Sequence, residues 1–132
     1  MGNMKKGDTF KHNFTITEDI YSGFINLFQD KNPLHTDTDF AISKKFNGKV
    51  MHGNILNGFL SFFIGELLPV KNVIIQTQSI KYIKPIYLGD ALELTAEVAT
   101  VIEVISGIEF NFSFSNSQGQ KVARGTVLIG II

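Results

Sequence analysis

The second half of the chain alternates apolar and polar residues, which is the pattern of half-buried β-strands. The alternation is clearest at residues 92–98 and 108–114, where every second side chain is apolar. We also expect strands at 73–83 and 122–131, and a short one at 10–14. Turn signals separate the later strands at Gly89-Asp90, Ser106-Gly107 and 116–119. These segments predict an antiparallel meander.

The first half of the chain has helical periodicity instead. Thr17 precedes two acidic residues, which is typical of a helix start. The apolar residues that follow share one helix face, and they are Ile20, Phe24, Leu27 and Phe28. The Asn32-Pro33 step disfavours helical geometry, so this helix should stop before Lys31. A second, short helix should begin within 36–39 and end near Asn47-Gly48.

The longest expected helix covers residues 54–68, and its apolar residues occupy nearly the whole circumference. A helix that is apolar all round must be buried on most sides. In a chain this small, only a sheet that curls around the helix can bury it. Because helices come first and antiparallel strands follow, the sequence predicts an α+β fold with the sheet wrapped around a central helix.

Composition narrows the classes of protein. A length of 132 residues with 44% hydrophobic residues predicts one domain over 1–132. The 12 basic and 12 acidic side chains balance, which argues against a nucleic-acid or anionic-membrane partner. There is no cysteine, hence no disulfide or thiolate. The N-terminus does not look like a signal peptide and residues 55–68 are too short to span a bilayer, so we expect a cytoplasmic protein.

The segment Asp30-Lys31-Asn32-Pro33-Leu34-His35 is the strongest chemical signal. It sets a carboxylate and an imidazole five residues apart, a candidate acid–base pair. Asp and Asn before proline also form ordinary turns, which is the structural alternative. Downstream, His52-Gly53 opens the longest helix. Because the first N–H groups of a helix lack internal partners, the amide of Gly53 is a candidate donor to an oxyanion.

These motifs together resemble the hotdog fold and, more narrowly, the MaoC-like or (R)-specific enoyl-CoA hydratases. The resemblance rests on the segment from Asp30 to His35, on His52-Gly53, on Ser61 in the helix and on residues 82–90. It implies that the segment with the Asp and His overhangs the central helix and that two subunits join their sheets. Gln29 and Asn54 depart from the family pattern without replacing the acid or base, so they bear on substrate preference more than on reaction type.

The resemblance implies a hydro-lyase that interconverts trans-2-enoyl thioesters and (3R)-3-hydroxyacyl thioesters. Asp30 would activate the water, His35 would complete the proton transfer, and the amide of Gly53 would stabilise the enolate oxygen. The substrate would be a thioester of CoA or of an acyl carrier protein. No separate cofactor is implied, because the thioester carries its own pantetheine arm. A homodimer or a dimer of dimers is expected, since one sheet leaves unprotected edges.

Other polar residues have weaker signals. Ser61 either bonds the carbonyl one helical turn back or supports the acid–base pair. Asn32 is expected mainly to fix the turn, although we group it with Gly53 and Ser61 as a candidate substrate-binding residue. For His52 we favour a structural hydrogen bond at the start of the helix. No metal site is expected, because His35 and His52 lie far apart in sequence.

Three alternative functions stay open at this point. A 3-hydroxyacyl-ACP dehydratase would run the same chemistry backwards on a carrier protein. A hotdog acyl-thioesterase would drive water onto the carbonyl and release free thiol without loss of the enoyl absorbance. A non-catalytic subunit would only bind acyl chains, and the presence of both Asp30 and His35 argues against it.

Overall fold

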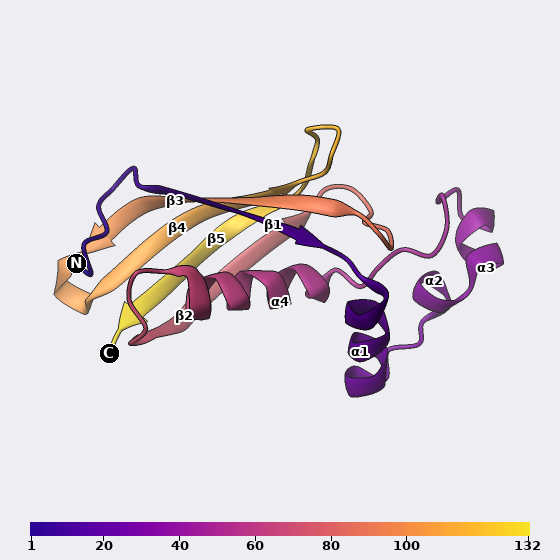
Figure 1. Ribbon diagram of the computed structural model, residues 1–132, viewed down its shortest axis with the longest axis horizontal. Helices are drawn as coiled ribbons and strands as arrows, with labels where there is room; N and C mark the ends of the chain where they lie inside the picture. Colours follow the sequence, from indigo (N-terminus) through magenta and orange to yellow (C-terminus); the bar gives the residue numbers. More distant parts are fainter.

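A five-stranded antiparallel sheet carries one long helix along its face, as Figure 1 shows for the computed structural model, which describes residues 1–132. In chain order the elements are β1 (Thr9–Thr15), α1 (Glu18–Phe28), α2 (Pro33–Thr36), α3 (Thr38–Ser43), α4 (Asn54–Phe62), a π-helical turn η1 (Phe63–Leu67), β2 (Val73–Tyr82), β3 (Ala91–Ile102), a 3₁₀ turn η2 (Glu103–Ile105), β4 (Gly107–Ser115) and β5 (Lys121–Ile131). Helices α1, α2 and α3 gather beyond the N-terminal end of α4, while both chain termini lie at the opposite end of the molecule.

The strands follow the order β1-β3-β4-β5-β2, and all neighbouring pairs are antiparallel. The expected meander is therefore confirmed for β3, β4 and β5 only. Strand β2 does not join β3, its successor in the chain, but pairs with β5 at the far edge. The first two strands of the chain, β1 and β2, therefore form the two edges of the sheet. The last strand, β5, lies inside the sheet between β4 and β2.

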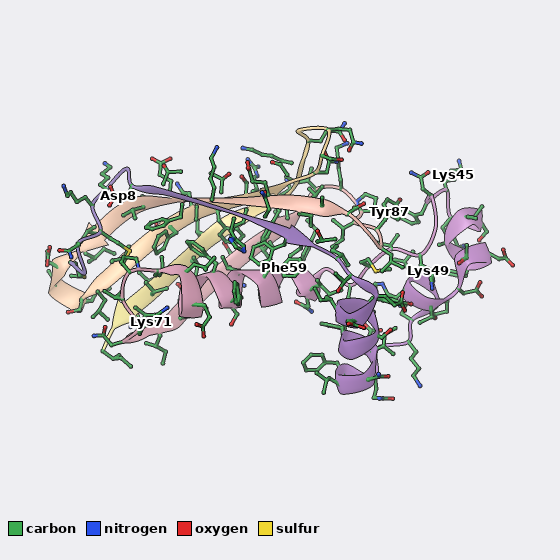
Figure 2. All side chains as sticks on the ribbon, viewed as in Figure 1. Asp8, Lys45, Lys49, Phe59, Lys71 and Tyr87 are labelled. Carbon is green, nitrogen blue, oxygen red and sulfur yellow. The ribbon has the colours of Figure 1, made fainter.

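The core lies between α4 and the concave face of the sheet. Ile55, Leu56, Phe59 and Leu60 of α4 are buried, and the ring of Phe59 stacks on Phe14 of β1 at 4.4 Å between centroids. Phe59 points from the helix toward the sheet (Figure 2). This packing supplies most of the apolar burial on which the fold depends.

The sheet wraps around the inner side of α4, as the sequence predicts, and the outer side of the helix is open. Phe62 is 45% exposed and Leu67 of the following π-helical turn is 37% exposed. A sheet of five strands covers only one side of a helix that lies along it. The apolar residues on the other side are therefore unprotected in a single chain.

Helix α1 begins and ends where the sequence predicts. The side chain of Thr17 accepts a hydrogen bond from the N–H of Ile20 at 3.2 Å, as an N-cap does. Gln29 ends the helix in the left-handed conformation, with φ of 61°. The second helix was expected to end near Asn47-Gly48, but α3 already ends at Ser43. The sequence analysis also did not predict the short helix α2.

No helix in the structure combines the length and the apolar character that crossing a membrane requires.

Candidate active site

A short turn brings Asp30 and His35 to the same side of the chain. After Gln29 reverses the backbone, Oδ1 of Asp30 accepts the N–H of Asn32 at 3.2 Å. The side chain of Asn32 in turn accepts the N–H of Leu34 at 2.9 Å and caps α2. The carboxylate Oδ2 then lies 3.8 Å from Nε2 of His35. Asn32 therefore fixes the turn, as its place before proline suggested.

The tautomer of His35 is set by the main chain. Its Nδ1 lies 2.7 Å from the carbonyl oxygen of Val50, and because a carbonyl only accepts, Nδ1 carries the hydrogen. In the neutral ring Nε2 is consequently a bare acceptor, and it faces Asp30. The side chain of His35 is 16% exposed, whereas that of Asp30 is 50% exposed. The pair thus presents two proton acceptors at a surface that solvent and substrate can reach.

His52 lies directly behind this pair. It is only 2% exposed, and its Nε2–H donates to the carbonyl oxygen of Asp30 at 2.9 Å. Its ring stacks on His35 at 4.0 Å between centroids and is 4.5 Å from the ring of Phe24. Its Nδ1 is buried and has no hydrogen-bond partner. The expected structural hydrogen bond of His52 thus goes to the main chain of Asp30, the residue that carries the candidate base.

A cavity of about 440 Å³ joins these groups to the start of α4. Its lining includes Asp30, His35, Val50, Gly53, Tyr82 and Lys84. The N–H of Gly53 makes no hydrogen bond within the protein, because it precedes the first turn of α4. The structure therefore brings Asp30, His35 and Gly53 around one cavity, and the N–H of Gly53 has no partner within the protein.

Glycine at position 53 makes room for an aromatic ring. A Cβ at this position would lie 2.8 Å from Cε1 of Tyr82, well inside contact distance. The aromatic ring of Tyr82, rather than an empty approach path, occupies the space that glycine leaves. The hydroxyl of Tyr82 accepts a hydrogen bond from Asn57 at 3.0 Å, which holds the ring in place.

Ser61 is not brought into this cavity. It lies eight residues beyond Gly53, about 12 Å along the helix axis. It is exposed, on the open side of α4. Asn54, one of the departures from the family pattern, does line the cavity, and the other, Gln29, forms the left-handed end of α1.

Sequence distance was a poor argument against a metal site, because the fold brings Asp30, His35 and His52 together. One ligand atom from each lies within 4.8 Å of the others. However, an imidazole binds a metal through the lone pair in its ring plane, and the two rings stack at an interplanar angle of 29°. Lone pairs in stacked planes do not converge on one ion. The arrangement suits a stacked pair of neutral rings better than a shared metal.

The hydrogen bonds of the tyrosines near the site are contacts that sequence reasoning missed. The hydroxyl of Tyr21 donates to the carbonyl of His35 at 2.6 Å, and that of Tyr87 accepts the N–H of Asn47 at 3.2 Å. Tyr87 lies where the sheet meets the segment that carries α2 and α3 (Figure 2). A buried tyrosine usually makes a hydrogen bond through its hydroxyl. The sequence can therefore indicate that a partner exists, but it does not identify the partner.

A comparison with known families decides the classification. The sequence profile of the MaoC-like domain matches residues 3–113. The chain belongs to this family. Among curated members, an (R)-specific enoyl-CoA hydratase of Rhodospirillum rubrum is 34% identical over 100 residues, which cover 75% of this chain and 69% of that protein. Another (R)-specific enoyl-CoA hydratase, from Aeromonas caviae, is 39% identical over 77 residues, or 58% of this chain and 56% of that protein.

The fold of this MaoC-like chain matches solved structures over nearly its full length. The (R)-hydratase from A. caviae involved in PHA biosynthesis superposes with a TM-score of 0.90 at 24% identity, covering 98% of both chains. The α+β hotdog fold implied by the sequence is therefore confirmed. More distant curated matches, from Arabidopsis thaliana and Solanum lycopersicum, are mitochondrial 3-hydroxyacyl-[acyl-carrier-protein] dehydratases.

Proposed function

We propose that this protein is an (R)-specific enoyl-CoA hydratase, a hydro-lyase that adds water reversibly to trans-2-enoyl thioesters and gives (3R)-3-hydroxyacyl thioesters. The observation that carries the proposal is the convergence of a carboxylate, an imidazole acceptor and a free helix N-terminal amide on one cavity. The two curated relatives with this name support it, and the stereochemistry is inferred from them.

The geometry suggests how water is activated. Oδ2 of Asp30 and Nε2 of His35 are 3.8 Å apart, so one water molecule can donate a hydrogen bond to each. Both groups are acceptors at the outset. As the water oxygen bonds to the β-carbon, its proton passes to the Asp30–His35 pair, and the pair then delivers a proton to the α-carbon. One water thus supplies both the hydroxyl and the new C–H hydrogen.

Gly53 stabilises the charge that develops between these two proton transfers. When the β-carbon is attacked, electron density moves onto the thioester oxygen to form an enolate. The unpaired N–H of Gly53 and the positive end of α4 lie at the same cavity. Losing one such donor costs other enzymes roughly 2.7–4 kcal/mol in the transition state.

The proposal is tested by following the ultraviolet absorbance of the conjugated double bond in crotonyl- and octenoyl-CoA. Asp30→Asn and His35→Gln should each lower kcat by about 10²–10⁴-fold, because each replaces a group that can accept a proton by an amide that cannot. Asp39→Asn is the matched control, since Asp39 is exposed on α3 and lies outside the cavity lining. Wild-type rates in a folded Asp30→Asn or His35→Gln variant would exclude the mechanism.

A second candidate is a 3-hydroxyacyl-ACP dehydratase, which the two plant mitochondrial relatives favour. The chemistry at Asp30 and His35 is the same and runs in reverse, so the carrier decides between the two. Comparing kcat/KM for the CoA and carrier-protein forms of one acyl chain separates them. A preference for the carrier-protein thioester would replace hydratase by dehydratase as the physiological activity.

The acyl-thioesterase and the non-catalytic subunit are tested in the same assay. A thiol-reactive dye detects hydrolysis, and thiol release without loss of the double bond would favour the thioesterase. No turnover of any thioester, with retained binding, would favour the non-catalytic subunit. We expect the active form to be a homodimer or a dimer of dimers, and the cytoplasmic location stays a prediction.

A further inference from the structure

His52 is the one buried polar side chain in the core, and the mechanism above does not use it. Its polar and aromatic contacts lie in the neighbourhood of the acid–base pair. Its Nε2–H bonds the carbonyl of Asp30, one ring face stacks on His35, and the ring of Phe24 lies 4.5 Å away. A histidine buried only for packing has no reason to be tied to both members of a candidate pair.

We propose that His52 is a positioning residue that fixes Asp30 and His35 relative to the amide of Gly53 without touching the substrate. This inference rests on the proposed hydratase function. It adds His52 as the residue that holds the two proton-transfer groups in place. It concerns the carbonyl of Asp30 and the ring of His35, not a third proton donor.

The tether to Asp30 is the first part of the argument. The carboxylate of Asp30 is half exposed, and apart from His35 its side chain contacts only the local N–H of Asn32. The bond from His52 joins main chain and side chain across 22 residues. Because Gly53 follows His52 directly, this bond holds the main chain of Asp30, from which the carboxylate extends, against the start of α4.

The stack on His35 is the second part. The Val50 carbonyl holds Nδ1 of His35 at 2.7 Å, which fixes one point of the ring. A ring held at one point can still tilt about that bond. Contact with the flat face of His52, at 4.0 Å and 29°, opposes the tilt and keeps Nε2 directed at Asp30.

The partnerless Nδ1 of His52 is the third part. A proton on this buried atom would be a donor without an acceptor. The Nε2–H is therefore the one hydrogen bond of the His52 ring, and the carbonyl of Asp30 sets how the ring lies against His35.

The test uses two substitutions that separate the contacts. His52→Phe keeps an aromatic face and removes the donor, and we expect kcat to fall by about 10²-fold, the loss that a displacement of roughly 1 Å can cause. KM should change by less than about two-fold, because no substrate contact is lost. His52→Gln keeps an N–H at a similar reach and should recover part of the lost kcat.

The matched control is His12→Phe on β1. His12 also lies against aromatic rings, at 4.8 Å from Phe14 and 6.0 Å from Phe62. It makes no contact with the cavity, so its variant should keep the wild-type kcat. A folded His52→Phe enzyme with wild-type kcat would overturn the proposal.

Combining His52→Phe with Asp30→Asn distinguishes positioning from general loss of structure. If His52 acts through Asp30, the histidine substitution should lower the residual kcat of Asp30→Asn by less than about three-fold. Equal fold-losses in the two backgrounds would show that His52 acts independently and would overturn the proposal.

NMR tests the ring stack on His35 without relying on catalysis, because His52→Gln removes the aromatic face and keeps an N–H donor. The Nδ1–H of His35 should give a slowly exchanging imidazole resonance in the wild-type protein, and it should shift or exchange faster in His52→Gln. An unchanged resonance would overturn the proposal even if His52→Phe did not fold. If the wild-type protein hydrates no thioester but the resonance responds, the proposed function fails while the positioning contact stands.

Discussion

At the scale of single residues, the site depends on main-chain carbonyls more than on side-chain networks. Val50 offers its carbonyl to His35, and Asp30 offers its own to His52. Each bond leaves one imidazole nitrogen without a hydrogen. The chemistry proposed for His35 follows from this choice, since a bare Nε2 accepts a proton from water.

The close approach of Tyr82 to Gly53 predicts the effect of a single methyl group. Gly53→Ala places a Cβ 2.8 Å from Cε1 of Tyr82, so either the ring or the start of α4 must move. We expect a loss of about 1–3 kcal/mol in the free energy of unfolding, as in other overpacked sites. Urea denaturation measures it.

The control for this substitution removes the ring. In a Tyr82→Ala background, Gly53→Ala should cost much less, because the two positions are coupled through direct contact. An equal loss in both backgrounds would mean that the ring is not what requires glycine.

Local spacing explains which site residues could be predicted from sequence. Asp30 and His35 belong to one turn and Gly53 to a helix start, so their roles follow from neighbouring residues. The partners of His35 and His52 lie 15 and 22 residues away, and no local pattern indicates them. Ser61 was suggested by resemblance alone, and in this chain its position on the open side of α4 separates it from the pair.

At the scale of elements, alternation and caps predict structure well where the neighbours are local. Strands β3 and β4 show strict alternation and are joined through η2, and Thr17 marks the start of α1. The edge position of β2 was not predictable in this way, because it depends on pairing with β5, more than forty residues later.

The contact between β2 and β5 requires glycine at position 125. A Cβ there would lie 1.9 Å from the carbonyl oxygen of Ser79 and 2.8 Å from the ring of Phe112. A backbone oxygen in a sheet cannot rotate away as a flexible side chain can. We expect Gly125→Ala to lower the free energy of unfolding by more than about 4 kcal/mol, an exceptional loss for one substitution. Thermal unfolding by circular dichroism measures it.

Gly58→Ala is the matched control for the sheet glycine. This residue lies within α4, and a Cβ there would meet nothing within 4 Å. Alanine should therefore stabilise the protein by about 0.5–1 kcal/mol through its higher helix propensity. If both variants melted at the wild-type temperature, the packing described for Gly125 would be wrong.

At the scale of the whole molecule, a single chain leaves large apolar side chains in water. Phe62 and Leu67 are exposed beside α4, Leu27 and Phe28 at the end of α1, and Ile74 on the edge strand β2. The edges β1 and β2 also carry unpaired main-chain groups. A second copy that covers α4 and β2 would protect both features, in agreement with the expected homodimer.

This predicts a mass of about twice 14.7 kDa in sedimentation equilibrium at micromolar concentration. Phe62→Glu should weaken the association, because it places a charge in the apolar contact. Val104→Glu is the control, since Val104 is 94% exposed on η2 and belongs to neither α4 nor β2. A wild-type protein that sediments as a monomer would contradict the expected assembly.

The bond between His35 and the carbonyl of Val50 also bears on how such a site can diversify. Every amino acid brings the same carbonyl, so exchanging the side chain at position 50 leaves the proton arrangement of the imidazole intact. Yet that side chain is part of the cavity wall. Position 50 is therefore a place where selection or protein engineering can reshape the space for an acyl group while the reaction itself is inherited unchanged.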